Sequence, residues 1–355
     1  MNMMLLHRWA GLIFGGWLAL VCLSGAILVY KNPLLSLLYP QLATVGPVAD
    51  VSDWGPLVNQ LQQDGRFRFV RLPSADAPWL EAVTSDKQHY YYDLQHGLLL
   101  VRDNYSDVFG WLYEFHLYLL AGETGRELLG ICALAGILLM LTGLYRWWPT
   151  QWHWSLWRVP AWRNDLKTSR QWHTSFGSIT LPLMLLCCVT GALLVYSRPV
   201  NTALFWLLAE QPVSSEVKYK AAVPLNEGDW QQALQVASQQ WPGAELRLLS
   251  LRRQPADLFR FRIKGTEEWH PNGRSVVLID PATYQVVIAD NAAEFSIVQR
   301  AFNLVYPLHI GSVGGEIYRI LLVIGGLIPL LLAVTGYIYY IQRRRRKGLQ
   351  QPTAG

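Results

Sequence analysis

The chain has 355 residues, of which 52% are hydrophobic and only 15% are charged, and its formal net charge is +5. The length permits more than one domain, while the composition points to a membrane protein before a soluble one. The positive charges gather beside apolar segments, so they indicate membrane topology and argue against a nucleic-acid partner.

Four apolar segments are long enough to cross a bilayer, since about 20 such residues span its hydrocarbon core as a helix. They cover residues 9–30, 127–148, 175–196 and 318–341. Two polar stretches, 31–108 and 197–301, separate them and show the alternation of a folded soluble part. The pattern predicts a mainly α membrane protein with four transmembrane helices and two outward-facing α+β modules.

The flanking cations predict the orientation of the spans. The connector between the second and third spans is basic, and so is the tail from Arg343 to Lys347. By the positive-inside rule both lie in the cytoplasm, as does the N-terminus. The polar stretches then face outward, which in a bacterial inner membrane means the periplasm. Membrane lipid is therefore an expected partner.

The two halves of the chain repeat the same residues at matched spacing. With an offset of 166, the first set is His7, Gly11, Cys22, Ser24-Gly25 and Tyr30, and its copy is His173, Gly177, Cys188, Thr190-Gly191 and Tyr196. With an offset of 193, Tyr113, His116, Glu123, Arg126 and Thr142-Gly143 match Tyr306, His309, Glu316, Arg319 and Thr335-Gly336. This pattern indicates a duplication in which each half contributes two histidines.

Each polar stretch predicts a helix followed by short strands. In the second stretch the helix covers 229–240, and the strands cover 245–252, 257–264, 275–280 and 284–289. In the first, the helix runs from Asp53 to about residue 63, and the strands cover 66–72, 79–84, 88–93 and 98–102. Helix and strand signals in this order are typical of a small α+β module.

The four repeated histidines are the candidate ligands. His7 and His173 begin spans on the cytoplasmic side, while His116 and His309 precede spans on the outward side. Glycines after the latter two predict turns, so 109–120 and 302–310 are expected to be short interfacial helices. Two facing imidazoles inside a helical bundle are typical of axial ligation, and we expect one b-type bis-His haem near each face.

Arginines near the histidines are candidate partners of the haem propionates: Arg8, Arg126, Arg170 and Arg319. Anchoring at the membrane interface is an equally good interpretation. Zinc at each histidine pair is a minor alternative, for which Glu123 and Glu316 would have to complete the coordination. Tryptophans between 147 and 162 predict an interfacial belt, with a quinol seat beside His153 as a lesser alternative.

Other residues narrow the chemistry. All four cysteines lie inside predicted spans, so no disulfide framework, covalently attached haem or iron–sulfur cluster is expected. In the polar stretches we interpret His89, His96 and His270 as surface histidines, because none has a neighbour at metal-ligand spacing. Basic residues there would suit an anionic chelate, although a solvated face is favoured for them: Arg66, Arg68, Arg71, Arg252 and Arg253.

The chain resembles the PepSY-associated transmembrane family of iron-regulated inner-membrane proteins. The resemblance covers all four spans and is carried by residues 7–11, 24–25, 116, 122–126, 142–149, 172–174, 177, 190–191, 309–311, 314–316, 319 and 335–336. Within that family it is most similar to the FoxB-type ferrisiderophore reductases. This resemblance implies haem ligation by His7, His116, His173 and His309, with a ferric siderophore as substrate. Because the chain has no dinucleotide fingerprint, electrons are expected from a quinol or a separate donor protein.

The expected organisation has eight parts: 1–30, first span; 31–108, first periplasmic module; 109–148, interfacial helix and second span; 149–172, cytoplasmic connector; 173–197, third span; 198–301, second module; 302–342, interfacial helix and fourth span; 343–355, cytoplasmic tail. The expected function is an oxidoreductase that reduces Fe(III) in a ferric siderophore. A siderophore or iron permease and a PepSY regulatory or binding protein without redox activity remain alternatives.

Overall fold

The computed structural model describes residues 2–46, 50–103, 105, 107–149, 152–213 and 223–349. The end of the predicted basic tail, 350–355, lies outside these residues. The chain forms two compact units, each built from separate segments. The bundle comprises Met1–Val29, Leu112–Ser197 and His309–Gly355, and the sheet domain comprises Tyr30–Trp111 and Arg198–Leu308.

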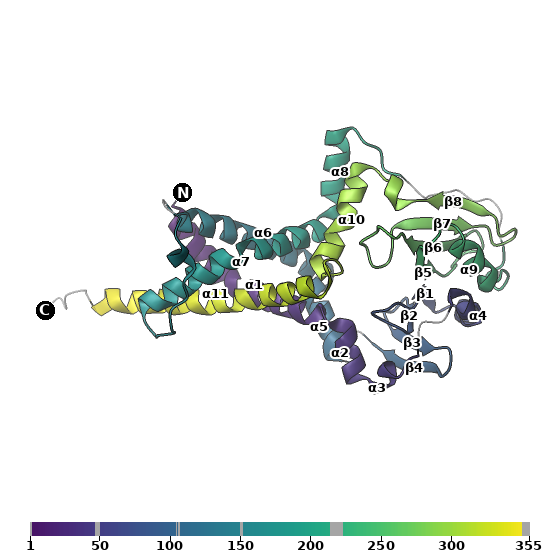
Figure 1. Ribbon diagram of the computed structural model, residues 1–355, viewed down its shortest axis with the longest axis horizontal. Helices are drawn as coiled ribbons and strands as arrows, with labels where there is room; N and C mark the ends of the chain where they lie inside the picture. Colours follow the sequence, from purple (N-terminus) through teal and green to yellow (C-terminus); the bar gives the residue numbers. More distant parts are fainter. Residues whose placement is uncertain are drawn as a thin grey trace. The chain divides into compact units, whose positions relative to one another are not determined.

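Four long apolar helices make the bundle (Figure 1): α1 (Met3–Leu28), α6 (Gly122–Trp147), α7 (Leu166–Val195) and α11 (Gly315–Leu349). Helix α1 contacts α6 and α11, and α7 contacts the same two, so the four helices form a ring. Each is long and apolar enough to cross a membrane. The predicted four spans are confirmed, and the chain is a multi-pass membrane protein.

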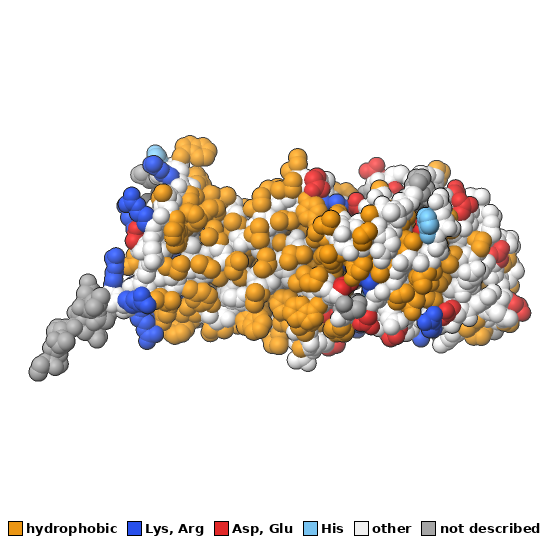
Figure 2. Space-filling view, turned by 90° about the horizontal axis from the view of Figure 1, so that it is seen from below, with side chains coloured by type: hydrophobic (Ala, Val, Ile, Leu, Met, Phe, Trp, Pro, Cys, Tyr) orange, Lys and Arg blue, Asp and Glu red, His pale blue; other side chains and the backbone are white. Residues whose placement is uncertain are grey.

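The outer surface of the bundle is apolar (Figure 2). Large side chains such as Ile13, Trp17 and Leu134 are about half exposed, at 59%, 53% and 50%. A helix satisfies its own backbone hydrogen bonds, so such surfaces are stable against lipid. The arginines at 343–346 are exposed near the end of α11, where cations suit a membrane–water interface.

Small residues let the helices approach closely. A Cβ atom at Gly326 of α11 would come within 2.7 Å of the Ala26 Cβ on α1, and one at Gly130 of α6 within 2.5 Å of the Tyr196 hydroxyl. Such contacts replace hydrophobic exclusion as the force that holds helices together in lipid. Midway along the bundle the core is filled by Met140, Met184 and Cys188 and the residues packed against them.

Two shorter helices precede the even-numbered spans: α5 (Val108–Tyr118) and α10 (Ile297–Ile310). Each ends in a turn with left-handed backbone, at Leu119, Leu120 and Gly122 after α5 and at Gly311, Gly314 and Gly315 after α10. The remaining short helices are α2 (Lys31–Leu38), α3 (Pro40–Ala43), α8 (Ser197–Leu208) and the 3-10 turns η1 (Val51–Trp54), η2 (Trp154–Trp157) and η3 (Ala292–Glu294).

The sheet domain holds both predicted α+β modules. Module 1 (51–102) has α4 (Gly55–Asp64), β1 (Phe67–Arg71), β2 (Leu80–Thr84), β3 (His89–Asp93) and β4 (Gly97–Arg102). Module 2 (230–290) has α9 (Trp230–Ser238), β5 (Glu245–Ser250), β6 (Phe259–Lys264), β7 (Ser275–Ile279) and β8 (Val286–Asp290). The α+β fold class of these stretches is confirmed.

The sequence did not indicate that the modules share one sheet. Strands β1 and β5 pair antiparallel, with Val70 opposite Leu249, and the strand order is β4-β3-β2-β1-β5-β6-β7-β8. Each module alone would expose β1 or β5 as an edge strand with unpaired backbone groups, and the pairing satisfies both edges.

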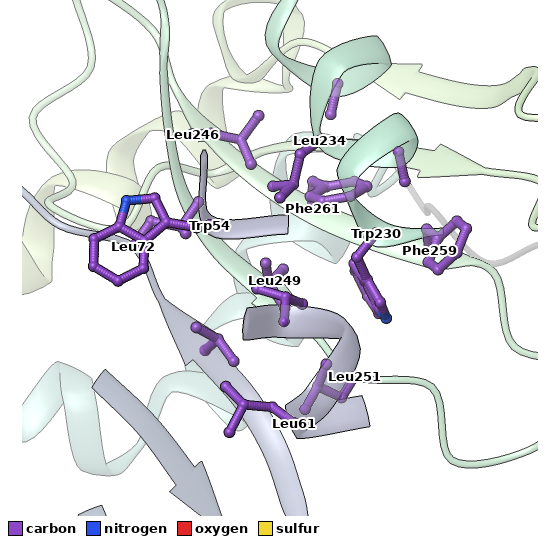
Figure 3. Packing of buried hydrophobic residues seen from close by; sticks show 14 of the residues in the cluster. Trp54, Leu61, Leu72, Trp230, Leu234, Leu246, Leu249, Leu251, Phe259 and Phe261 are labelled. Carbon is purple, nitrogen blue, oxygen red and sulfur yellow. The ribbon is translucent and has the colours of Figure 1, made fainter. Parts of the chain in front are cut away.

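One core lies between the sheet and the helices α4 and α9 (Figure 3). Trp54 and Trp230 begin equivalent helices and are 2% and 0% exposed. In β6 the alternate residues Phe259, Phe261 and Ile263 enter this core. Because successive strand residues point to opposite faces, the residues between them lie on the other face of the sheet.

Candidate functional site

The structure brings the four repeated histidines together in two pairs within the bundle. The ring centroids of His7 (α1) and His173 (α7) lie 6.2 Å apart. Those of His116 (α5) and His309 (α10) lie 6.1 Å apart. Each pair therefore contains one histidine from each half of the duplication.

Each histidine ring rests on a neighbouring helix in the same way. The Nδ1 atom of His7 lies 3.1 Å from the Leu139 carbonyl and 3.0 Å from the Thr142 hydroxyl. The Nδ1 atom of His116 lies 3.1 Å from the Val21 carbonyl and 3.0 Å from the Ser24 hydroxyl. The contact helix is α6 for His7 and α1 for His116.

The second half repeats these contacts. His173 Nδ1 lies 3.0 Å from the Leu332 carbonyl and 3.3 Å from the Thr335 hydroxyl on α11. His309 Nδ1 lies 2.9 Å from the Thr190 hydroxyl on α7 and also bonds the Cys187 carbonyl. We call each set of carbonyl, hydroxyl and following glycine a histidine seat. The four seats are Val21/Ser24/Gly25, Leu139/Thr142/Gly143, Cys187/Thr190/Gly191 and Leu332/Thr335/Gly336.

The seats determine which ring nitrogen carries the proton. The four hydroxyls each donate along their own helix at 2.7 Å, to the carbonyls of Val21, Leu138, Leu186 and Leu331. Their oxygens are then left to accept, and so are the carbonyls that face the rings. Nδ1 must therefore be the N–H donor, which makes Nε2 the unprotonated nitrogen that can bind a metal.

In two of the seats, those of His116 and His7, the glycine makes room for the imidazole. A Cβ atom would lie 2.8 Å from the His116 Cε1 atom at Gly25 and 3.2 Å from that of His7 at Gly143. The corresponding distances are 3.4 Å at both Gly191 and Gly336. Contacts below about 3.4 Å are shorter than carbon–carbon packing tolerates without movement, since the optimum is about 3.5–4.0 Å. Gly25 and Gly143 are therefore needed for the ring positions, whereas Gly191 and Gly336 are in ordinary contact with their rings.

The two pairs lie at different depths of the bundle. On α1 the histidine of one pair, His7, is 17 residues from Ser24, which contacts the other pair, and on α7 His173 is 17 residues from Thr190. At 1.5 Å per residue the separation along each helix is about 25 Å. The pairs are thus near opposite ends of the membrane-crossing part.

The four candidate arginines differ in their surroundings. The buried Nε atom of Arg8 has no hydrogen-bond partner among the described residues. Arg126 and Arg319 bond helix-end carbonyls, of Val195 at 3.3 Å and of Gly311 at 3.4 Å. Arg170 is exposed on α7, three residues before His173 and on the same side of the helix. Arg8 is therefore the one with an unsatisfied group beside a histidine.

The histidine pairs fit a haem better than zinc. With metal–nitrogen bonds of about 2 Å and ring atoms about 1.1 Å from the centroid, trans imidazoles have centroids about 6 Å apart. Zinc needs four ligands, but within the described residues no three His, Cys, Asp or Glu side chains gather where they could hold a metal. Glu123, proposed as a zinc ligand, is 78% exposed and faces Arg126. A haem supplies its other four ligands itself.

An aromatic cluster lies between α6 and α7 in the sequence. Trp147 contacts Trp152 and Trp157, with ring centroids 5.4 and 6.0 Å apart, and Trp148 contacts Trp152 at 5.4 Å. These rings suit an interfacial belt. His153 is exposed and its Nδ1 bonds the Ser155 hydroxyl at 2.9 Å, so it is not aimed at either histidine pair.

The structure corrects several predictions about the polar stretches. His270 is not a surface residue: it is 4% exposed because its loop folds it onto Tyr306, with centroids 5.1 Å apart. His89 is largely enclosed and bonds Glu81 at 2.6 Å, whereas the side chain of His96 is 59% exposed. Arg252 is also buried, because its guanidinium donates to five backbone carbonyls.

The chain matches the PepSY-associated TM region over residues 4–343, which is nearly its whole length. It therefore belongs to that family, and the resemblance seen in the sequence is confirmed at the family level. No match was found among curated proteins.

Proposed function

We propose that this protein is a membrane-embedded ferric-chelate reductase, which passes electrons through two bis-His haems to a ferric siderophore in the periplasm. The observation that carries the proposal is the pair of matched histidine sets, each with its Nδ1 hydrogens anchored and its ring centroids about 6 Å apart. The FoxB-type ferrisiderophore reductases are the functional type that the sequence most resembles.

The residues have distinct roles in this proposal. His7 and His173 hold one haem, and His116 and His309 hold the other. The seats keep each Nε2 unprotonated and prevent rotation of the ring. Arg8, with its unpartnered Nε, would bind a propionate. When bound, the haems supply one-electron transfer between the two faces of the membrane.

The bundle contributes the environment for that transfer. Apolar residues around Met140, Met184 and Cys188 fill the space between the two depths and exclude water. Burial among such side chains is one of the means by which a protein tunes a haem potential. Electrons would enter from a quinol or a separate donor on the side of His7 and His173, where the aromatic belt also lies.

The proposed reaction needs no acid or base from the protein. Siderophores with hard oxygen donors hold Fe(III) strongly, while Fe(II) is softer and is bound less well by such donors. One electron therefore releases the iron from the chelate. We assign no catalytic side chain beyond the haem ligands.

The first test is an absorption spectrum of detergent-purified protein, oxidised and dithionite-reduced, with haem measured per chain. We expect two low-spin b-type haems, reoxidised when a ferric siderophore is added without oxygen. His309→Ala should lose one of the two, because the remaining His116 cannot complete axial ligation. His96→Ala, at an exposed site, is the matched control.

Other outcomes would favour the alternatives. A colourless protein after expression with ample haem would contradict the reductase and return attention to a permease or a regulatory module. Full haem content in the His309→Ala variant would contradict the ligand assignment. If the protein contains haem that ferric siderophores do not reoxidise, the haem assignment would stand but the siderophore would be rejected as the substrate.

A further inference from the structure

One face of module 2 carries cations that the sequence did not single out. In β6 the residues Arg260, Arg262 and Lys264 alternate with the core residues, so all three lie on the face opposite α4 and α9. Alternate residues are about 6.7 Å apart along a strand, so the three positions extend over about 13 Å. Arg274 immediately precedes the neighbouring strand β7, whose Ser275 pairs with Ile263.

Two of these arginines are close together, and a single carboxylate, that of Glu268, interacts with both. Burial, together with the neighbouring Arg274 and Arg260, lowers the pKa of Arg262 to about 10. Burial also lowers the pKa of Arg274. Within the described parts of the chain, the buried Nε atom of Arg274 has no hydrogen-bond partner. Two guanidiniums that share one carboxylate keep an excess positive charge, which a bound anion would neutralise.

Glu268 interacts electrostatically with both arginines, but within the described residues it forms no ion pair with either guanidinium. Its Oε2 atom accepts a hydrogen bond from the backbone N–H of Gly265 at 3.2 Å. Its Oε1 atom and the Nε atom of Arg274 are both buried and lack hydrogen-bond partners among the described residues. A buried donor left unsatisfied costs about 1–3 kcal/mol, so this arrangement points to a missing acceptor.

The loop that carries these groups is firmly held. Gly273 has a φ of +66°, and a Cβ there would lie 2.2 Å from the Ile263 carbonyl oxygen, so only glycine fits. His270 stacks on Tyr306 with ring planes 25° apart. Trp269 beside it is 50% exposed and offers an apolar surface next to the cations. Tyr306 and His309 lie three residues apart on α10.

We infer that Arg262 and Arg274, with Arg260 and Lys264 beside them, form a binding site for a carboxylate-bearing anion, and that this anion is a negatively charged ferric chelate. Planar guanidiniums bind carboxylates in bidentate fashion, and partial burial strengthens the bond. The choice of a chelate rests on the proposed function. This site would favour anionic, carboxylate-containing ferric chelates as substrates and disfavour cationic ones.

The test is binding of Ga(III)–citrate, which resembles an anionic ferric chelate but is not reduced under these conditions. Equilibrium dialysis with radioactive gallium would use the full-length protein in detergent. We expect Arg262→Gln combined with Arg274→Gln to weaken binding about a hundredfold, since one lost charged hydrogen-bond pair corresponds to about tenfold. The matched control is Arg68→Gln combined with Arg253→Gln, two exposed arginines, which should leave binding within about twofold.

A second variant guards against misfolding. Glu268→Gln keeps the acceptor for Gly265 but removes the local negative charge, so it should tighten Ga(III)–citrate binding severalfold. A loss of binding in this variant would overturn the inference. Equal weakening in the control pair would also overturn it, because non-specific attraction would then be sufficient.

The ligand source and the proposed function are tested separately. Vesicles of phosphatidylglycerol test a lipid phosphate as the ligand. If they displace Ga(III)–citrate only from protein with intact arginines, and bind more tightly than Ga(III)–citrate does, the site binds a lipid phosphate. That result would overturn the inference that a ferric chelate occupies it. If wild-type protein contains haem and is reoxidised by ferric chelates but does not bind Ga(III)–citrate, the inference fails while the function stands. If it binds Ga(III)–citrate but contains no haem, the function fails, and so does the assignment of the anion as a substrate.

Discussion

Modules 1 and 2 have equivalent strands but opposite charge at one matched position. Glu81 lies opposite Arg71 across β1 and β2, and Arg260 lies opposite Ser250 across β5 and β6. In module 1 the carboxylate of Glu81 accepts from Arg71 and also bonds the His89 ring. At the matched position, module 2 has the cation Arg260, whereas module 1 has the anion Glu81, which neutralises Arg71.

The rest of module 1 is neutralised in the same manner. The guanidinium of Arg102, 4% exposed, bonds the Asp107 carboxylate and the Tyr91 hydroxyl, and Asp107 also accepts from Tyr39. Such a network is complete without a ligand. The basic face of module 2, in contrast, lacks enough acceptors among the described residues to complete its network. The cores of the two modules are nevertheless alike. Features shared by both modules serve folding, and the feature that differs is the better candidate for recognition.

The two halves of the bundle, unlike the two modules, have kept the same functional residues, because all four histidine seats are present. Small differences between the seats lead to the first prediction. Gly25→Ala should displace the His116 ring, since the new Cβ would lie 2.8 Å from Cε1, and the haem of that pair should be largely lost. Gly191→Ala meets His309 at 3.4 Å, so that protein should keep two haems. Haem per chain from pyridine haemochrome spectra distinguishes them, and equal loss in both would contradict the seat geometry.

The second prediction compares the modules at their matched position. Glu81→Gln removes the carboxylate that pairs with Arg71 and His89, in a site where the Glu81 side chain is 12% exposed. Breaking a fully buried pair costs about 3–5 kcal/mol, and because Arg71 is partly exposed we expect about 2 kcal/mol. Arg260→Gln should change stability by less than about 0.5 kcal/mol or increase it. Thermal unfolding in detergent measures both, and a larger loss for Arg260→Gln would reverse the comparison.

The four spans, the matched histidines and the strands of the two modules were predictable from the sequence. The duplication is visible as residues repeated at fixed offsets, and the strands are visible as alternation of apolar and polar residues. The offsets of 166 and 193 predicted which histidines correspond, and the alternation in residues 257–264 predicted a strand with one apolar face. The role of Ser24-Gly25 and its counterparts was not predictable. It depends on α5 lying against α1 and α10 against α7, and a sequence repeat does not specify which helices touch.

The burial of His270 also had no signal in the sequence. Its position depends on Gly273, whose left-handed backbone closes the loop, and on Tyr306, which is distant in the chain. Likewise the joining of the modules through β1 and β5 requires long-range pairing that strand periodicity cannot indicate. The two histidine pairs were found because the repeat indicates them, whereas these other contacts between distant segments were missed.

The third prediction uses pH to separate the modules. Burial and the nearby Arg274 and Arg262 lower the pKa of His270 to about 3. The ordinary pKa of histidine is about 6.5, so as the pH falls the unfolded chain takes up the proton before the folded protein does. The stability that neutral His270 contributes is therefore complete above about pH 6.5 and falls as the pH drops toward 3. Burial raises the pKa of Asp107, but bonds from Arg102 and Gly110 outweigh it and lower the value to about 2.

For Asp107 the stability is present above about pH 3.9 and is lost only as the pH falls toward 2. Between pH 6 and 4.5, module 2 should therefore lose about 1.4 kcal/mol per pH unit while module 1 remains unchanged. Hydrogen exchange of the β5–β8 and β1–β4 amides measures each module separately. His270→Gln should remove the difference, and its persistence in that variant would show that another group is responsible.

The smallest expected effect concerns the hydroxyls of the two seats that serve the His116–His309 pair. Ser24→Ala and Thr190→Val each remove one acceptor from an Nδ1–H group but leave the carbonyl, so both haems should be retained. Accepting from Nδ1–H makes the imidazole more basic and favours Fe(III), hence losing the hydroxyl should raise the haem reduction potential. A bond worth about 1 kcal/mol corresponds to roughly 40 mV for one electron, which is an upper limit because the carbonyl remains. Redox titration should show the same upward shift in both variants. A downward shift would mean that the hydroxyl donates to the ring and that Nδ1, not Nε2, lacks the proton.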